Sequence, residues 1–284
     1  MRKNIAAVTV LYNPDKNFLT NINSYAKFVS LLIVIDNSEN PDLSFHAALS
    51  SNPLIKIITY NENKGIASAL NDGINMASQS GFEWVLTMDQ DSSFEETMLE
   101  RYLSYFERMP EKSQIAAFGP AFEGDNLKNQ EITAVKVASV ITSGSLVNVS
   151  IFNKIGGFDN KLFIDEVDHE YCYRAGSIGF TVFQLPQIYL QHRLGKQVSV
   201  TGISGKKNMQ KTLHSPLRLY YIVRNSCHVI SRYRASLPVE MKIKRKDVLV
   251  RIKNNFLYGN SKIDMLKYVV RGFVDYKRGR FGKY

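Results

Sequence analysis

Short apolar runs alternate with amphipathic stretches through the first half of the chain. Runs rich in β-branched residues predict four strands, at residues 5–12, 31–36, 55–60 and 84–89. Apolar side chains at helical spacing predict a helix that opens after Gly65 and closes near Gly81, with one face formed by Ile66, Leu70, Ile74 and Ala77. Alternation of this kind builds βαβ units, so we predict an α/β fold with a mostly parallel central sheet and helices on both faces.

The rhythm changes in the second half. Strands are expected near residues 114–122, 133–149 and 180–185, with a helix that follows the acidic block at residues 165–168. From Leu217 the pattern is helical to the end. A loose polar junction with two glycines and two lysines precedes it. We therefore expect a first domain of residues 1–210 and a helical extension of residues 211–284.

Charge separates the same two regions. The chain has a formal net charge of +10, and residues 232–284 hold 15 Lys and Arg against four Asp and Glu, so the first 231 residues are close to neutral. Aromatic and aliphatic residues are interleaved with these cations, as in helices that lie on a membrane surface. The extension is expected to meet a polyanionic surface, and we favour an anionic membrane over nucleic acid because no nucleic-acid motif stands in it. Helices that only cap the domain, or form a dimer contact, are the competing interpretation, and the oligomeric state is open.

The remaining composition indicates a protein that folds without disulfide bonds or a structural metal ion. Only Cys172 and Cys227 are present, in different segments, which argues against a disulfide framework or a zinc site. The N-terminus runs directly into a strand pattern, and no apolar run approaches the roughly 18 residues of a membrane-spanning helix. We expect a cytoplasmic protein, peripheral at the inner leaflet of the membrane if the extension binds there.

Polar residues follow three of the predicted strands: Tyr12-Asn13-Pro14, Asp36-Asn37-Ser38 and Asp89-Gln90-Asp91. Ligands of open α/β sheets collect at the carboxyl ends of strands, although ordinary loops begin there too. Side chains two apart on a strand point the same way, so Asp89 and Asp91 form a hard oxygen site suited to Mg²⁺ or Mn²⁺. Such an ion would hold phosphates.

Two further polar segments have both a binding and a structural interpretation. The carboxylate of Asp36 could accept the imide N–H of a pyrimidine ring, or it could form an Asx turn with Ser38. The segment 61–67 opens the best helix of the chain, where Asn63 and Gly65 could cradle a polar ligand through free backbone N–H groups or simply cap the helix.

Residues 165–168 contain three carboxylates, which repel one another and raise at least one pKa, as suits a general base; a solvated helix start is the alternative. His192 is either structural or a third, imidazole ligand for the metal. Arg218 and Arg224 lie in one helical stretch, where they could clamp a diphosphate or form a solvated basic face.

Taken together and in order, these segments resemble the inverting glycosyltransferases of family 2, which have the GT-A fold, and more narrowly their bacterial rhamnosyltransferase-like members. The matching segments are residues 10–14, 34–38, 61–67, 88–91, 142–145, 156–159, 163–168, 192–195 and 215–225. The resemblance implies a Rossmann-like GT-A domain with a C-terminal helical extension. It also implies a reaction in which one displacement inverts the anomeric carbon, so that no enzyme nucleophile is needed.

The resemblance assigns roles to individual residues. In the family's acidic motif the base is the Asp six residues before an Arg, and Asp168 and Arg174 match that spacing, with Asp165 as a supporting carboxylate. Many relatives carry Glu-Asp or Asp-Tyr-Val-Asp there, whereas this chain has Asp-Glu-Val-Asp, so that Glu166 adds a charge. The nucleotide-sugar is expected to meet Tyr12, Asn13, Asp36, Asn63, Gly65, Asp89, Arg218 and Arg224. The divalent cation is expected at Asp89, Asp91 and His192, and the acceptor at Thr142, Ser143, Gly144 and Glu166.

The implied reaction moves a sugar from a nucleotide-diphosphate donor to a saccharide in cell-surface polysaccharide synthesis. We expect dTDP-rhamnose as the donor, with a UDP-sugar as the alternative, and a saccharide or lipid-linked oligosaccharide as the acceptor. A sugar-1-phosphate nucleotidylyltransferase would have a Gly-rich basic loop after the first strand, which Tyr12-Asn13-Pro14-Asp15 lacks. A basic nucleic-acid-binding protein is the alternative from another class, and we expect no nucleic-acid partner.

Overall fold

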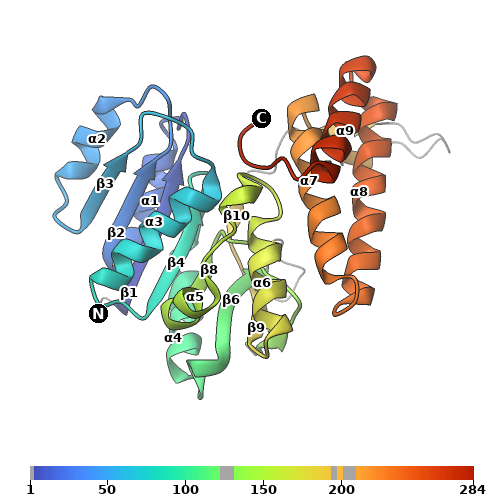
Figure 1. Cartoon of the computed structure of the whole chain (residues 1–284). Coiled ribbons are helices and arrows are strands. Elements are labelled where there is room, and N and C mark those ends of the chain that lie inside the picture. Colours follow the sequence, from blue (N-terminus) through green and yellow to red (C-terminus); the bar gives the residue numbers. More distant parts are fainter. Residues whose placement is uncertain (1–2, 122–130, 193–196, 201–208) are drawn as a thin grey trace. The chain divides into compact units, whose positions relative to one another are not determined.

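The computed structural model describes residues 3–121, 131–192, 197–200 and 209–284, which form two compact units (Figure 1). The first unit comprises Met1–Phe163, Val167–His192 and Lys283, and the second comprises Ile164–Glu166, Arg193–Gly282 and Tyr284. Asp165 and Glu166 of the acidic motif, with Ile164 before them, therefore belong to the second unit, although the chain on either side of these three residues belongs to the first.

The first unit is built on an eight-stranded sheet in the order β3-β2-β1-β4-β8-β6-β9-β7. Its strands are β1 (Lys3–Leu11), β2 (Val29–Asp36), β3 (Ile55–Thr59), β4 (Trp84–Asp89), β6 (Ile115–Ala121), β7 (Val135–Lys136), β8 (Ser145–Asn148) and β9 (Thr181–Tyr189). The pairs β3–β2, β2–β1 and β1–β4 are parallel, and so is the pair β6–β9. Strand β8 is antiparallel to both β4 and β6, and β7 is antiparallel to β9. The α/β fold with a mostly parallel sheet is confirmed.

Helices cover both faces of this sheet (Figure 1). They are α1 (Phe18–Ala26), α2 (Leu43–Ser50), α3 (Ile66–Gln79), α4 (Glu96–Arg108), α5 (Val149–Ile155) and α6 (Val167–Ser177), with 3₁₀ turns at Lys112–Gln114 and Asn160–Leu162. Val8 of β1 packs in one core cluster with Ile74 of α3, while the adjacent Ala7 packs in the other with Phe18 of α1. Because both faces are buried, the central strands are mostly apolar, and Thr9 and Thr87 are polar residues buried among them.

The predicted strands near the N-terminus correspond to β1–β4, and the predicted helix after Gly65 is α3. The stretch 133–149 is different, since only β7 and β8 form strands there. Gly144 interrupts it with φ of +79°, and a side chain at this position would come within 2.7 Å of Leu190 and 2.8 Å of Pro120. Only glycine fits this turn, which leads the chain into β8.

The second unit contains a hairpin and three helices. The hairpin pairs β11 (Gln197–Val200) with β12 (Met209–Thr212), and the helices are α7 (Pro216–Tyr233), α8 (Pro238–Tyr258) and α9 (Lys262–Lys277). A core of Leu219, Ile222, Val248 and Met265 joins the three helices. α9 approaches α7 closely at Gly272, where a Cβ would lie 2.6 Å from the carbonyl oxygen of Tyr220. A domain boundary at residue 210 stays a prediction.

No helix in the described ranges combines the length and hydrophobicity needed to cross a bilayer.

Candidate active site

The carboxyl ends of β1, β2 and β4 lie level at one edge of the sheet. Leu11 pairs with Asp36, and Val10 pairs with Asp89. The polar residues that follow these strands are therefore neighbours, as the sequence predicts. We call this edge, with Tyr12, Asn13, Asp36, Asn63 and Asp89, the strand edge.

Asp36 is buried at the strand edge and both of its carboxylate oxygens are engaged. Its residue surface is 1% exposed. The backbone N–H of Ser38 donates to Oδ1 at 3.0 Å, which is the Asx turn considered from the sequence. His46 of α2 donates its Nε2–H to Oδ2 at 2.7 Å. His46 could not be identified from the sequence, because its contact with Asp36 depends on how α2 packs beside β2.

The segment before α3 is tied to the end of β2 by amide side chains. Asn37 donates its Nδ2–H to Oδ1 of Asn63 at 3.1 Å, and it accepts from the backbone N–H of Lys64 at 2.8 Å. The backbone N–H of Gly65 donates to Oδ1 of Asn63 at 3.0 Å. The N–H of Gly65, expected to be available for a ligand, is thus used to close this loop.

Gly65 also lies against Phe163, which stands two residues before the acidic motif. It has φ of +86°, and a Cβ there would lie 2.5 Å from the ring of Phe163. The following N–H, of Ile66, donates to the carbonyl of Phe163 at 2.8 Å. Glycine is required at this position both for the backbone conformation and for the close approach.

Gln90, between the two aspartates, connects β4 to the end of β1. Its Oε1 accepts from the backbone N–H of Tyr12 at 2.7 Å, and its Nε2–H donates to the carbonyl of Tyr12 at 3.1 Å. The next N–H, of Asn13, donates to Oγ of Ser38 at 2.8 Å. These bonds hold the backbone of Tyr12 and Asn13, while 43% of Tyr12 stays exposed. From the sequence, Gln90 is only the middle residue of Asp89-Gln90-Asp91, and its two bonds to Tyr12 could not be predicted from that position.

The proposed metal ligands lie at the end of β4. Asp89 is its last residue, whereas Asp91 lies in the turn that follows, so strand alternation does not govern the direction of Asp91. Both residues are partly exposed. Within the described part of the chain, no group of three or more acidic, His or Cys side chains could hold a metal. Two carboxylates nevertheless suit Mg²⁺, which usually keeps several waters and binds substrate phosphates as its other ligands.

His192, the expected third ligand, is placed only by its backbone. It lies in β10 (Gln191–His192), which pairs with β5 (Ser92–Ser93), and His192 is opposite Ser92. Ser92 directly follows Asp91, so the backbone of His192 is near the acidic pair in the fold. Its side chain lies outside the described residues.

The segment Thr142–Gly144 is also at the end of β4. Oγ of Ser143 accepts from the backbone N–H of Asp89 at 3.1 Å, and the N–H of Gly144 donates to the carbonyl of Thr87 at 2.7 Å. Ser143 is 1% exposed and Thr142 is partly exposed. The three residues expected at the acceptor therefore adjoin the aspartate that ends β4, and Thr142 is the one with a side chain accessible to solvent.

The acidic motif, Asp165–Asp168, contains three carboxylates with different partners. Arg218 donates to Oδ1 of Asp165 at 2.7 Å, and Lys244 lies 2.6 Å from Oε2 of Glu166. Burial raises the pKa of Asp165 above its ordinary value, while the Arg218 guanidinium acts in the opposite direction. Asp168 lies in the first turn of α6, in the first unit, and its carboxylate accepts from the backbone N–H of His169 at 2.8 Å. Its side chain is 20% exposed and lies 2.9 Å from Nδ1 of His169.

The cations expected at the diphosphate are engaged within the second unit. Arg218 pairs with Asp165, as described above. Arg224 is 1% exposed, with its guanidinium 5.0 Å from the ring of Tyr221 and donating to the carbonyl of Gly282 at 2.8 Å and to Oδ1 of Asn225 at 2.9 Å. In this arrangement Arg224 serves the packing of the unit, so its predicted contact with a diphosphate gains no support.

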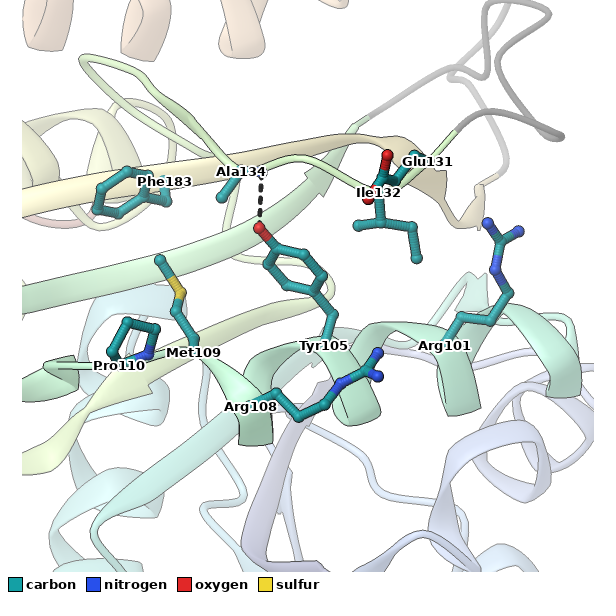
Figure 2. Close-up of a pocket in the computed structure, with 9 residues that line it drawn as sticks. All are labelled: Arg101, Tyr105, Arg108, Met109, Pro110, Glu131, Ile132, Ala134 and Phe183. Atoms are coloured by element: carbon teal, nitrogen blue, oxygen red, sulfur yellow. Dashed lines mark hydrogen bonds between the residues drawn. The ribbon is translucent and has the colours of Figure 1, made fainter.

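A pocket of about 670 Å³ lies elsewhere in the first unit (Figure 2). Figure 2 shows Tyr105 of α4 pointing between Arg101 and Arg108 toward Ala134, whose N–H donates to the phenol oxygen at 3.1 Å. Its other lining residues are Met109, Pro110, Glu131, Ile132 and Phe183. None of these described lining residues belongs to the predicted site.

Comparison with known proteins gives one family. The profile of Glycosyl transferase family 2 matches residues 7–174. The chain is 30% identical to the dTDP-rhamnosyl transferase RfbF of Shigella flexneri, over 99% of this chain and 98% of the relative. An uncharacterized glycosyltransferase of Haemophilus influenzae is 30% identical over 31% of this chain and 34% of its own.

Solved structures share the fold at low sequence identity. GalNAc-T7 with UDP, GalNAc and Mn²⁺ superposes with a TM-score of 0.59 at 12% identity, over 96% of this chain and 56% of that longer chain. S. aureus TarS 1–349 in complex with UDP-GlcNAc superposes with a TM-score of 0.57 at 15% identity, over 99% of this chain and 82% of that one. The match of the profile to more than half of the chain, and of a relative to nearly all of it, shows that this protein belongs to glycosyl transferase family 2.

Proposed function

We propose that the protein transfers rhamnose from dTDP-rhamnose to a saccharide acceptor, with inversion at the anomeric carbon, in the synthesis of a cell-surface polysaccharide. The observation that carries this proposal is the level alignment of Asp36 and Asp89 at the carboxyl ends of β2 and β4. These strands flank β1, so a carboxylate for the pyrimidine ring and a carboxylate for a diphosphate-bound cation stand at the carboxyl ends of the sheet, where ligands of open α/β sheets bind. The full-length similarity to a relative named as a dTDP-rhamnosyl transferase supports the choice of donor.

The strand edge would bind the nucleotide. Asp36 would accept the imide N–H of the pyrimidine through a remaining lone pair, and the exposed ring of Tyr12 offers a surface against which the base can stack. Asn13, Asn63 and Gly65 would shape the loops that enclose the sugar-nucleotide. A UDP-sugar meets the same acceptor chemistry, so it stays the alternative donor.

A divalent cation fits the donor set at the end of β4. Asp89 and Asp91 would hold it, with His192 as a further ligand. The ion would neutralise the negative charge that develops on the departing diphosphate. Mg²⁺ and Mn²⁺ both suit these ligands.

Asp168 would act as the base. It would take the proton from an acceptor hydroxyl while that oxygen bonds to the anomeric carbon, and the bond from this carbon to the nucleotide diphosphate would break with its electron pair leaving on the diphosphate oxygen. Support for Asp168 over its neighbours comes from the ion pairs of Asp165 with Arg218 and of Glu166 with Lys244, and from the partial exposure of the Asp168 side chain. Thr142, Ser143, Gly144 and Glu166 would line the acceptor side.

A transfer assay tests the function. The protein is incubated with labelled dTDP-rhamnose or UDP-sugars, with and without a saccharide or lipid-linked acceptor, and product is separated from donor. We expect turnover with dTDP-rhamnose that EDTA abolishes and that Asp91→Asn lowers at least tenfold. Turnover only with a UDP-sugar would replace the donor, and no turnover with any donor, acceptor or cation would overturn the proposal.

We also propose that α8 and α9 bind an anionic membrane surface, where a lipid-linked acceptor would be found. Ile263, Leu266, Val270 and Phe273 recur along one face of α9 and are 47–74% exposed. Ile243, Val250 and Leu257 recur every seven residues along α8, with Lys246 and Lys253 on the same face. Apolar side chains flanked by lysine match the acyl boundary and the negative headgroups of one leaflet.

Vesicle sedimentation tests this surface. We expect binding to vesicles that contain phosphatidylglycerol, little binding to pure phosphatidylcholine, and loss of binding in Leu266→Ser/Val270→Ser. The matched control, Val135→Ser/Ile178→Ser, removes two exposed apolar side chains of the first unit and should bind as the unaltered protein does. Concentration-dependent dimers without vesicle binding, or salt-sensitive binding to nucleic acid alone, would overturn the membrane assignment.

A further inference from the structure

Side chains from two helices of the second unit, α7 and α8, contact residues Ile164–Glu166. Asn225 of α7 donates its Nδ2–H to the carbonyl of Ile164 at 2.6 Å and to that of Asp165 at 3.2 Å. The next residue of α7, Ser226, donates its hydroxyl to Oε1 of Glu166 at 2.9 Å. Backbone and side chain of this short segment are therefore both fixed.

Lys244 of α8 completes this arrangement. Its ammonium lies 2.6 Å from Oε2 of Glu166, and the two side chains are only 9% and 12% exposed. An ion pair so removed from water is screened little, so removal of one partner leaves the charge of the other buried without compensation. Glu166 is also the carboxylate by which this motif differs from many relatives, and Lys244 compensates the charge that it adds.

The backbone of the segment needs such external support. Asp165 and Glu166 both have φ of +65°, in the left-handed region that residues with side chains seldom occupy. Oδ2 of Asp165 is buried without a hydrogen-bond partner among the described residues. Conformations of this kind persist where the surroundings over-determine them, and they cluster at functional sites.

We propose that Lys244 is a positioning residue for the reaction: by pairing with Glu166 it neutralises the additional carboxylate and holds Asp165 and Glu166 in the conformation from which the chain continues to Asp168. Lys244 touches neither substrate nor reacting atoms in this proposal and acts through Glu166. The inference rests on the proposed role of Asp168 as the base.

The electrostatic consequence distinguishes this role from simple packing. The charged groups around the segment are Arg218 and Arg251, which favour the ionised form of Asp165, and Glu166, which opposes it. Without Lys244 the charge of Glu166 is uncompensated, and nearby carboxylates hold their protons to higher pH. The acidic limb of the pH profile of kcat should then move upward, which a mere loss of packing does not cause.

The test compares Lys244→Met with Lys244→Arg, Lys244→Met/Glu166→Gln and Lys242→Met, an exposed lysine on the same helix. For Lys244→Met we expect kcat to fall roughly tenfold at an unchanged donor KM, and the acidic limb to rise by about half to one pH unit. The double variant should return the limb to its original position, Lys244→Arg should keep most of the activity, and Lys242→Met should match the unaltered protein.

Two readouts keep the inference separate from the proposed function. If the unaltered protein turns over but the acidic limb of Lys244→Met does not move, or if activity only tracks the folded fraction, Lys244 has no positioning role. If no donor is turned over, carbon NMR titration of the Asp165 carboxyl decides: its pKa should rise in Lys244→Met and return in the double variant, in which the charge of Glu166 is also removed. An unchanged carboxyl titration would overturn the inference.

Discussion

The strand edge and the acidic motif each hold several polar groups in place, but they do so with different kinds of partner. At the strand edge the partners are mostly neutral: Asn63 and Gln90 accept from backbone N–H groups of the loops, and the backbone N–H of Ser38 and the ring of His46 donate to the carboxylate of Asp36. In the acidic motif, cations from helices of the second unit, Arg218 and Lys244, meet the carboxylates.

The difference between the partners in the two regions matches the different roles that we propose for them. The register of parallel strands brings the strand-edge residues together, and the proposed function assigns them to binding of the nucleotide-sugar. In the acidic motif, Asp165 pairs with Arg218 and Glu166 pairs with Lys244, and the proposed function assigns the proton transfer to Asp168. A binding edge and a proton-accepting motif are therefore separable by mutation.

The largest effect should come from the acidic motif. In Asp168→Asn the base is lost, and we expect kcat to fall by about 10²–10⁴ with little change in the affinity for dTDP. Steady-state kinetics and calorimetric titration of dTDP measure the two quantities. Asp72→Asn, which alters an exposed carboxylate on α3, is the control. Near-normal turnover in Asp168→Asn would move the base to another carboxylate.

At the strand edge, Gly65→Ala should damage both stability and binding. Its Cβ would fall 2.5 Å from the ring of Phe163 at a φ of +86°, so we expect the free energy of unfolding to fall by about 2–4 kcal/mol. Urea unfolding measures it. Gly176→Ala, near the C-terminal end of α6 where nothing lies within 4 Å of the added Cβ, should be neutral or stabilising by up to about 1 kcal/mol. Equal unfolding curves for the two variants would show that the contact with Phe163 yields easily.

A smaller effect should isolate nucleotide binding. His46→Ala removes the donor to Oδ2 of Asp36, and we expect the donor KM to rise roughly tenfold with kcat within about twofold. His46→Gln, which keeps an N–H donor, should recover part of the affinity. A lower kcat with an unchanged KM would mean that Asp36 takes part in the chemical step rather than in binding.

The smallest effect concerns the stability of the second unit with pH. Burial, with the charges of Arg251 and Arg218, lowers the pKa of His214 from 6.5 to about 4. The neutral ring is therefore favoured in the folded state, and its contribution to stability is full above pH 6.5 and is lost as pH falls toward 4. Because the ring is partly solvated, we expect the contribution to be about 1 kcal/mol. Urea unfolding at pH 7 and pH 5 should show a shallower decline in His214→Asn, and parallel declines would contradict this assignment.

Much of the fold could be predicted from local pattern. The strands β1–β4 and helix α3 follow from apolar periodicity, and the place of Asp36 and Asp89 follows from the rule that parallel strands end together. The stretch 133–149 was harder to predict, because its apolar residues belong to short antiparallel strands separated by the turn at Gly144. Periodicity cannot separate such strands from the apolar turns between them.

The sequence by itself determined the order of the elements, the types of polar residue at the strand ends and the excess of charge near the C-terminus, since each depends on residues close together in the chain. Only the tertiary structure decided that His46 meets Asp36, that Gln90 ties β4 to β1 and that Arg218, Arg224 and Lys244 are used inside the second unit. Which ions pair is decided by distances between segments 50 to 80 residues apart, such as Asp165 with Arg218 and Glu166 with Lys244, and no local pattern encodes those distances.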